Sequence, residues 1–313
     1  MLDQWTGCVF ETVVATLSWA IVSYLALAVV LLTKIRHLDH CRADKKSAWW
    51  SWRSGGIGGR FVANKGGIVG NEIRIAMWSG PRNISTAMMR SWASRSDCFV
   101  CDEPLYAHYL QETGLPHPGA DETKRCHETD WRRVVSWLTG PIPEGASVFY
   151  QKQMAHHLVD EIKRDWLDRV TNCFLIREPA EMLTSLIEFI PEPTKFDTGL
   201  PQQVEILERV ATKMGEIPPV LEARDVLENP AGMLTALCRR VGLEFCDQML
   251  SWEVGPHASD GVWAKHWYAK VEKTTQFGAY RKKSVEVPKT LLPVLKECES
   301  LYEQLYDQRL TID

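Results

Sequence analysis

The feature that most constrains the fold is the alternation of short apolar runs with amphipathic stretches from residue 72 onward. The apolar runs have strand length, and the stretches between them repeat apolar residues at helical spacing. Alternation of this kind favours a three-layer α/β fold, in which helices cover both faces of a parallel sheet. The expected strands are Ile73–Trp78, Asp97–Cys101, Ser147–Tyr150, Asn172–Ile176 and Pro219–Glu222, and the expected helices are Ile84–Ala93, Asp130–Leu138, His156–Trp166, Ala180–Phe189, Pro230–Val241 and Leu291–Gln308.

Composition narrows the class of protein. The chain has 313 residues, 45% of them hydrophobic, which is enough for one or two domains with a sizeable core. Its net charge of −4 excludes a general basic nucleic-acid binder. Nine scattered cysteines do not form a disulfide framework and suit a reducing compartment. The spacing of Cys98 and Cys101 points their thiols to opposite faces of a strand, which disfavours a zinc or redox pair.

A long uncharged segment precedes this domain. Residues 12–33 carry no charged side chain, and as a helix they would span roughly 33 Å, enough to cross a bilayer. We therefore expect a membrane-anchor-like helix within residues 1–33, with a buried core helix as the alternative. Basic residues follow it, which favours a single-pass membrane protein with its main domain in the cytoplasm. A Golgi lumenal domain, or a cytosolic protein lacking this segment, remains the alternative.

Residues 34–71 are predicted to be a linker. Seven glycines lie between residues 55 and 70, and no stable periodicity surrounds them. The expected organisation is thus an anchor-like helix over residues 1–33, a glycine-rich linker over 34–71 and one α/β domain over 72–313.

The first motif of chemical interest begins where the first expected strand ends. Gly80 makes the turn into the next helix, and Arg82, Asn83, Ser85 and Thr86 surround that helix's start. Amide groups at a helix N-terminus, together with a cation and two hydroxyl groups, favour an anion. The alternative is ordinary capping of a strand–helix turn. No lysine precedes Thr86, so the segment is not a nucleotide-hydrolysing loop of the Walker type.

The second motif lies at a later strand–helix junction. Arg177 leaves an expected strand, and Ser185 follows eight residues later, two helical turns into the next helix. A guanidinium group binds phosphate through two parallel hydrogen bonds, so a strand ending in arginine suits a phosphate site. The alternative is a salt bridge from Arg177 to Glu178 or Glu181.

Together, the two motifs resemble the sulfotransferase superfamily, whose domains have a P-loop-type parallel sheet flanked by helices. The resemblance covers about residues 72–313. Within that superfamily the chain is similar to a sulfotransferase-like group, on the segments Ser79–Thr86 (SGPRNIST), Asp102–Leu110 (DEPLYAHYL), Tyr150–His157 (YQKQMAHH) and Val262–Tyr268 (VWAKHWY).

The resemblance implies 3′-phosphoadenosine 5′-phosphosulfate as sulfuryl donor, no metal, and a hydroxyl or amine acceptor on a small molecule or glycan. Lys152 resembles the family lysine that approaches the sulfuryl group. Arg177 and Ser185 would hold the 3′-phosphate, with Arg281 or Lys283 from a late basic loop closing over it. The alternative for that loop is a solvated basic run beside buried tryptophans. The 5′-phosphosulfate would lie against Gly80, Arg82, Asn83, Ser85 and Thr86.

The acceptor needs a general base, and three residues are candidates. Glu103 follows the second expected strand and ranks first. His156 ranks second and His157 third, since the resemblance places a catalytic histidine near this position. Gln153 departs from the histidine expected there, and the alternative for the adjacent histidines is a helix cap and a packed ring.

Three functions therefore compete. Sulfuryl transfer is favoured. Another phosphoryl-transfer enzyme or nucleotidase on a related P-loop fold is disfavoured by the missing lysine and magnesium carboxylate. A catalytically inactive nucleotide-binding scaffold is disfavoured because Arg82, Glu103 and Lys152 are all present.

Overall fold

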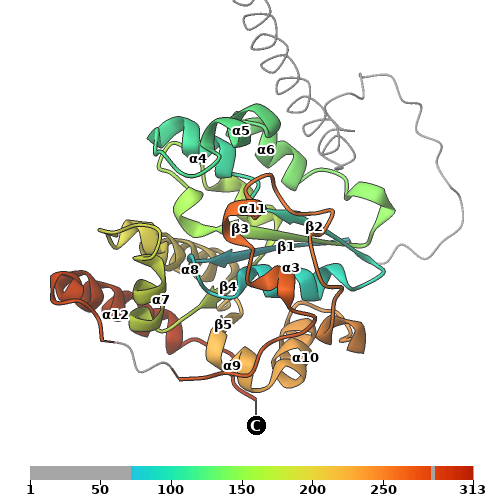
Figure 1. The fold of residues 1–313 in the computed structure, drawn as a ribbon. Helices are drawn as coiled ribbons and strands as arrows, with labels where there is room; N and C mark the ends of the chain where they lie inside the picture. Colours follow the sequence, from blue (N-terminus) through green and yellow to red (C-terminus); the bar gives the residue numbers. More distant parts are fainter. Residues whose placement is uncertain (1–71, 283–285, 313) are drawn as a thin grey trace, which may run out of the picture. The chain divides into compact units, whose positions relative to one another are not determined.

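A five-stranded, wholly parallel sheet forms the centre of the domain (Figure 1). The computed structural model describes residues 72–282 and 286–312. The strand order is β2-β3-β1-β4-β5, so the first strand lies in the middle. All five predicted strands are confirmed, and they span Ile73–Ser79 (β1), Cys98–Asp102 (β2), Val148–Met154 (β3), Thr171–Ile176 (β4) and Val220–Glu222 (β5).

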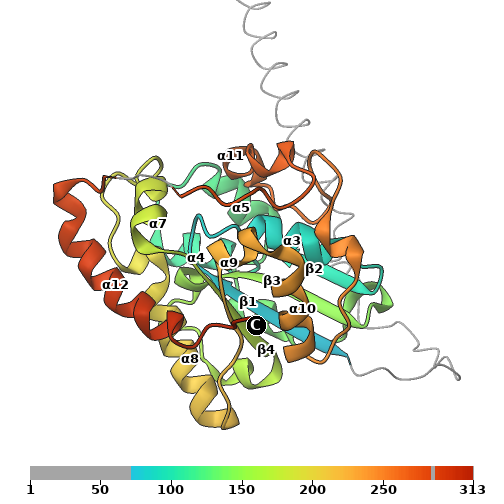
Figure 2. The same ribbon diagram turned by 90° about the horizontal axis from the view of Figure 1, so that it is seen from below.

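Helices cover both faces of the sheet, as the alternating pattern predicted (Figures 1 and 2). On one face, α3, α9 and α10 close a core in which Trp92 stacks on Tyr150 at 5.2 Å between ring centroids. On the other face, Trp137 of α6 packs on Phe149 of β3. The helices are α3 (Ser85–Ala93), α4 (Tyr106–Thr113), α5 (Ala120–Cys126), α6 (Trp131–Leu138), α7 (Pro179–Leu186), α8 (Leu200–Met214), α9 (Ala223–Glu228), α10 (Pro230–Arg240), α11 (Ala264–Trp267) and α12 (Leu292–Tyr306).

The central strands are almost entirely buried because both of their faces are covered, although β3 ends in the polar residues Gln151, Lys152 and Gln153 before Met154. Every residue of β3 is buried, and β1 is buried from Ile75 to Ser79. Continuous apolar runs rather than alternating ones are typical of such strands. The sequence pattern therefore identified all five strands, although β3 continues past its predicted end at Tyr150 to Met154.

The predicted helix over residues 156–166 is wrong. Two short 3-10 helices, η3 (Ala155–His157) and η4 (Asp165–Arg169), replace it, with an irregular turn between them. The Arg164 guanidinium donates hydrogen bonds to the carbonyl groups of Leu158 (3.3 Å) and Val159 (2.8 Å). A side chain therefore satisfies backbone acceptors that a continuous helix would have paired internally.

The anchor-like helix predicted over residues 12–33 and the linker over 34–71 lie outside the described residues. Across residues 72–282 and 286–312, no helix combines the length and the apolar character that crossing a membrane requires.

Candidate functional site

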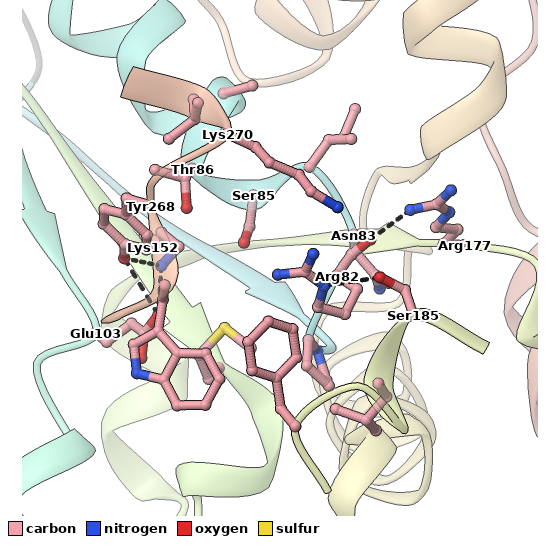
Figure 3. A pocket seen from close by; sticks show the side chains of 18 of the residues that line it. Arg82, Asn83, Ser85, Thr86, Glu103, Lys152, Arg177, Ser185, Tyr268 and Lys270 are labelled. Atoms are coloured by element: carbon pink, nitrogen blue, oxygen red, sulfur yellow. Dashed lines mark hydrogen bonds and ion pairs between the residues drawn. The ribbon is translucent and has the colours of Figure 1, made fainter. Parts of the chain in front are cut away.

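The register of the sheet brings both sequence motifs to one edge. Ser79, the last residue of β1, pairs with Met154 of β3 and with Leu175 of β4. The segments that follow these three strands therefore begin side by side. They line a cavity of about 440 Å³, which is within the usual range for a small-molecule site (Figure 3).

The loop between β1 and α3 is strained where it meets the cavity. Arg82 and Ile84 have φ angles of 64° and 54°, and Glu103, after β2, has a φ angle of 41°. Each left-handed non-glycine residue costs roughly 1–3 kcal/mol, and such residues cluster at functional sites. All three line the cavity.

Gly80 allows this loop to pack closely against the rest of the domain. A Cβ atom on Gly80 would lie 2.3 Å from the carbonyl oxygen of Thr198. Asn83 is 1% exposed and donates a hydrogen bond to the Leu175 carbonyl at 3.2 Å. Gly80 and Asn83, two of the five residues predicted for this motif, therefore shape the loop, and Asn83 also lines the cavity.

The start of α3 suits an anion. The helix has no side-chain cap and no acidic residue in its first turn. Ser85 and Thr86 line the cavity at this end, as the motif predicted. Uncapped amides and the positive end of the helix dipole stabilise negative charge placed there.

The two motif arginines meet in the same cavity. Nη1 of Arg177 donates to the carbonyl oxygen of Arg82 at 2.7 Å, and Nε of Arg82 donates to Oγ of Ser185 at 2.9 Å. Burial lowers the pKa of Arg82, and the charge of Arg177 lowers it further against the attraction of Glu188. An arginine nevertheless stays protonated in proteins, so this corner holds two cations.

Arg177 also makes the salt bridge that the sequence left open as an alternative. Its Nη2 atom lies 2.8 Å from Oε2 of Glu181 on α7, and its Nε atom donates to the same oxygen at 3.2 Å. These bonds and the one to Arg82 use three of the five N–H donors of the guanidinium group. The salt bridge thus orients Arg177 and leaves donors for a ligand.

A buried cluster of charged residues lies at the opposite end of the cavity (Figure 3). Lys152 is 1% exposed, and its ammonium group donates to Oδ1 of Asp102 at 2.8 Å, to the hydroxyl of Tyr268 at 2.7 Å and to Glu103. The pairing of Asp102 with Lys152 across β2 and β3 positions the lysine. Tyr268 donates to Asp102 at 2.7 Å and so connects α11 to the sheet edge.

The charges in this cluster set the protonation of its members. Burial raises the pKa of Glu103. The positive charge of Lys152 offsets part of this rise, and the negative charge of Asp102 adds to it. Burial lowers the pKa of Lys152, but the attraction of Asp102 and Glu103 is greater, so its pKa is raised overall. Lys152 is therefore a stable cation, and Glu103 is a stronger base than an ordinary glutamate.

The two histidines predicted as alternative bases also line the cavity, within a group of aromatic rings. His157 is 2% exposed and stacks on Tyr106 at 4.7 Å, and His156 meets Tyr109 edge-on at 5.3 Å. Burial lowers the pKa of His156 to about 4 and that of His157 well below its ordinary value. Both rings are neutral at pH 7 and weakly basic.

Those rings belong to a larger aromatic wall. Phe189 packs against Trp267 at 5.0 Å, and Trp267 packs against His117 at 6.3 Å. The Arg82 guanidinium lies 5.0 Å above the Phe189 ring. We define the aromatic wall as the cavity-lining rings Tyr106, Tyr109, His117, His156, His157, Phe189 and Trp267.

Some residues of the cavity were missed by the motif analysis, and two predicted residues, Gly80 and Arg281, do not line it. Tyr268 and Lys270 line the cavity, and Lys270 extends its ammonium group into the same space as Arg82 (Figure 3). Arg281 is exposed and does not line the cavity, although Gly278 and Ala279 just before it do. Its predicted contact with a 3′-phosphate stays a prediction, and Lys283 lies outside the described residues.

One known protein family matches most of the domain that carries this site. A family model described as "Sulfotransferase domain" matches residues 73–295. The chain belongs to this sulfotransferase domain family. The resemblance inferred from the strand-end motifs is thereby confirmed.

Two curated plant proteins and a solved bacterial domain are similar to this chain. Branched-chain-amino-acid aminotransferase-like proteins 2 and 1 of Arabidopsis thaliana are each 32% identical over 74% of this chain. The chain spans only 41% of the length of either relative. Among solved structures, the sulfotransferase domain of the Synechococcus PCC 7002 olefin synthase aligns with 77% of this chain and 98% of its own, at a TM-score of 0.48 and 14% identity.

Proposed function

We propose that the domain transfers a sulfuryl group from 3′-phosphoadenosine 5′-phosphosulfate to a hydroxyl or amine acceptor. One observation carries the proposal: Arg82 and Arg177 lie in hydrogen-bonded contact beside the uncapped start of α3, in one cavity. A nucleotide with phosphates at two positions needs two such anion sites at a short separation. The residues present therefore fit this donor.

The proposed chemistry is an in-line displacement at sulfur. The acceptor oxygen or nitrogen forms the new bond to sulfur while the bond from sulfur to the 5′-phosphate oxygen breaks. Arg82 and the α3 amides stabilise the negative charge that develops on that leaving oxygen. Lys152 would supply a fixed cation on the sulfuryl side of the cavity, because Asp102, Glu103 and Tyr268 hold its ammonium group in place.

We assign the general base to Glu103. The base must accept the acceptor's proton during transfer, and efficiency rises as its pKa approaches the working pH. Burial moves the pKa of Glu103 upward and the pKa values of His156 and His157 downward. The two histidines then belong to the wall of the acceptor site.

The aromatic wall supports a small-molecule acceptor with an apolar body. Its rings are uncharged at pH 7. The wall extends from the ring beneath Arg82 to Tyr106, which lies near Glu103. Burial of an apolar body against such rings contributes roughly 25 cal/mol per Å². The hydroxyl or amine of the acceptor would then point to Glu103.

Binding of the desulfated donor product tests the donor site. We expect Arg82→Ala and Arg177→Ala each to weaken 3′-phosphoadenosine 5′-phosphate by about 10- to 150-fold in calorimetric titration, because a charge-assisted contact contributes about 1.5–3 kcal/mol. Arg132→Ala removes a charge from an exposed arginine on α6 and serves as the matched control.

The same titrations separate the competing functions. Tighter binding of ATP with magnesium than of the 3′,5′-bisphosphate would favour the phosphoryl-transfer alternative. Retained 3′,5′-bisphosphate binding without turnover on any acceptor would favour an inactive scaffold. Unchanged affinity in both arginine variants would reject the donor site.

A further inference from the structure

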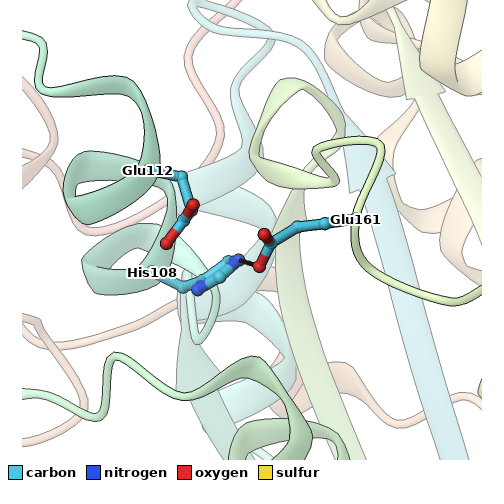
Figure 4. Close-up of side chains that lie close together, drawn as sticks. All are labelled: His108, Glu112 and Glu161. Carbon is cyan, nitrogen blue, oxygen red and sulfur yellow. Dashed lines mark ion pairs between the residues drawn. The ribbon is translucent and has the colours of Figure 1, made fainter.

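A buried histidine outside the cavity faces two carboxylates (Figure 4). His108 and Glu112 lie four residues apart on one face of α4, and Glu161 approaches them from the irregular segment after η3. One ligand atom from each residue lies within 4.8 Å of the others. None of the three lines the proposed donor and acceptor cavity.

The hydrogen bonding of His108 determines which of its nitrogens is free to bind a ligand. His108 is 2% exposed, and its Nδ1 atom lies 2.8 Å from the carbonyl oxygen of Thr129. A carbonyl group only accepts, so Nδ1 carries the proton and Nε2 of the neutral ring presents a lone pair. Metal-bound histidines typically donate their second ring nitrogen to a backbone carbonyl in this way.

The other ring nitrogen of His108, Nε2, is buried without a hydrogen-bond partner. It lies 3.0 Å from Oε1 of Glu161, yet it makes no hydrogen bond of acceptable geometry. Two electron-rich atoms so close together need a cation between or beside them. A proton on Nε2 would supply one, but the N–H bond would not aim at the carboxylate oxygen.

We propose that His108, Glu112 and Glu161 bind a divalent transition-metal ion, with zinc as the best match. One imidazole and two carboxylates form a ligand set that suits zinc better than magnesium or calcium, which take oxygen ligands. Two ligand atoms on a tetrahedral zinc ion lie roughly 3.4 Å apart, close to the 3.0 Å between Nε2 and Oε1. Exposure of Glu112 leaves the remaining coordination position open to water.

The ion would join two parts of the domain that form the aromatic wall. Tyr106 and Tyr109 belong to α4, and His156 and His157 belong to η3, immediately before the segment that carries Glu161. That segment lacks a continuous helix, and the Arg164 side chain rather than backbone amides pairs with the carbonyl groups of Leu158 and Val159. A metal bridge would therefore hold α4 and this segment at a defined separation.

Zinc titration of the full-length protein tests the site. After removal of metal with a chelator, we expect calorimetry to detect one tight zinc site per chain. The Glu112→Gln/Glu161→Gln double variant should bind zinc at least about 100-fold more weakly, since loss of a supporting contact alone costs roughly 10–100-fold. Glu208→Gln, an exposed glutamate on α8, is the matched control and should keep the wild-type affinity.

Two further measurements make the outcome decisive. Cobalt bound in place of zinc should show no thiolate charge-transfer band, because the ligands are nitrogen and oxygen. Both glutamates face solvent, so the metal-free double variant should unfold at the wild-type temperature. Retained tight zinc binding in the double variant, a thiolate band, or absence of zinc binding by the wild type would each overturn the proposal.

Discussion

At the residue scale, Glu103 is the proposed general base, so its substitution tests the proposed chemistry most directly. Its carboxylate lies at the end of the cavity beside Lys152, and burial keeps its pKa high. We expect Glu103→Gln to retain binding of 3′-phosphoadenosine 5′-phosphate and to lose roughly 100- to 10,000-fold in turnover, the usual contribution of a general base. Calorimetry and a coupled turnover assay measure the two effects. His156→Gln tests the alternative base, and a larger loss of turnover in it would transfer the role to the histidine.

Asp102 should set the pH at which that base becomes active. Two carboxylates share the ammonium group of Lys152, so the charge of Asp102 raises the pKa of Glu103. In Asp102→Asn this repulsion is lost, and the pKa of Glu103 should fall. The acidic limb of the kcat/KM profile should then move to lower pH. A limb that stays in place, or moves upward, contradicts the assignment of that limb to Glu103.

At the element scale, the loop between β1 and α3 depends on the absence of a side chain at Gly80. A methyl group there would meet the Thr198 carbonyl at 2.3 Å, and backbone cannot give way as a flexible side chain does. We expect Gly80→Ala to destabilise the fold by about 1–3 kcal/mol in chemical unfolding and to weaken donor binding. Gly278→Ala is the stability control, because an added Cβ meets no atom within 4 Å there.

The elements also show what sequence could and could not predict. The strands were predictable because apolar runs mark buried parallel strands, and their carboxyl ends must share one edge. The end of β3 was not, because its last four residues, Gln151–Met154, are mostly polar and lie beyond the apolar run that ends at Tyr150. The partnership of Lys152 with Tyr268 was not predictable, since 116 residues separate them and only folding brings α11 to the sheet. The segment from His156 to Trp166 was misread because its apolar spacing is helical, although Arg164 satisfies its carbonyl groups instead.

At the scale of the whole molecule, the domain buries histidines in an uncharged form. Burial lowers the pKa values of His127 and His156 to about 4 and that of His157 well below its ordinary value. In the unfolded chain a histidine has a pKa near 6.5. Between about pH 4 and about pH 6.5 the unfolded state therefore binds more protons than the folded state, which couples stability to pH.

The sign of this coupling gives a testable pH dependence. The stability contributed by keeping these rings neutral is present above about pH 6.5 and is lost as the pH falls toward about 4. For a histidine whose pKa folding lowers from near 6.5 to about 4, the loss is about 3 kcal/mol. Urea unfolding at about pH 5 and about pH 7.5 measures the loss. Asp260, whose pKa burial raises to about 6, acts in the opposite direction, so the comparison must be between variants. We expect His157→Gln to show a smaller difference between the two pH values than the wild type does. An equal difference in both proteins would mean that folding does not lower the pKa of His157, contrary to what its burial against Tyr106 and Tyr109 predicts.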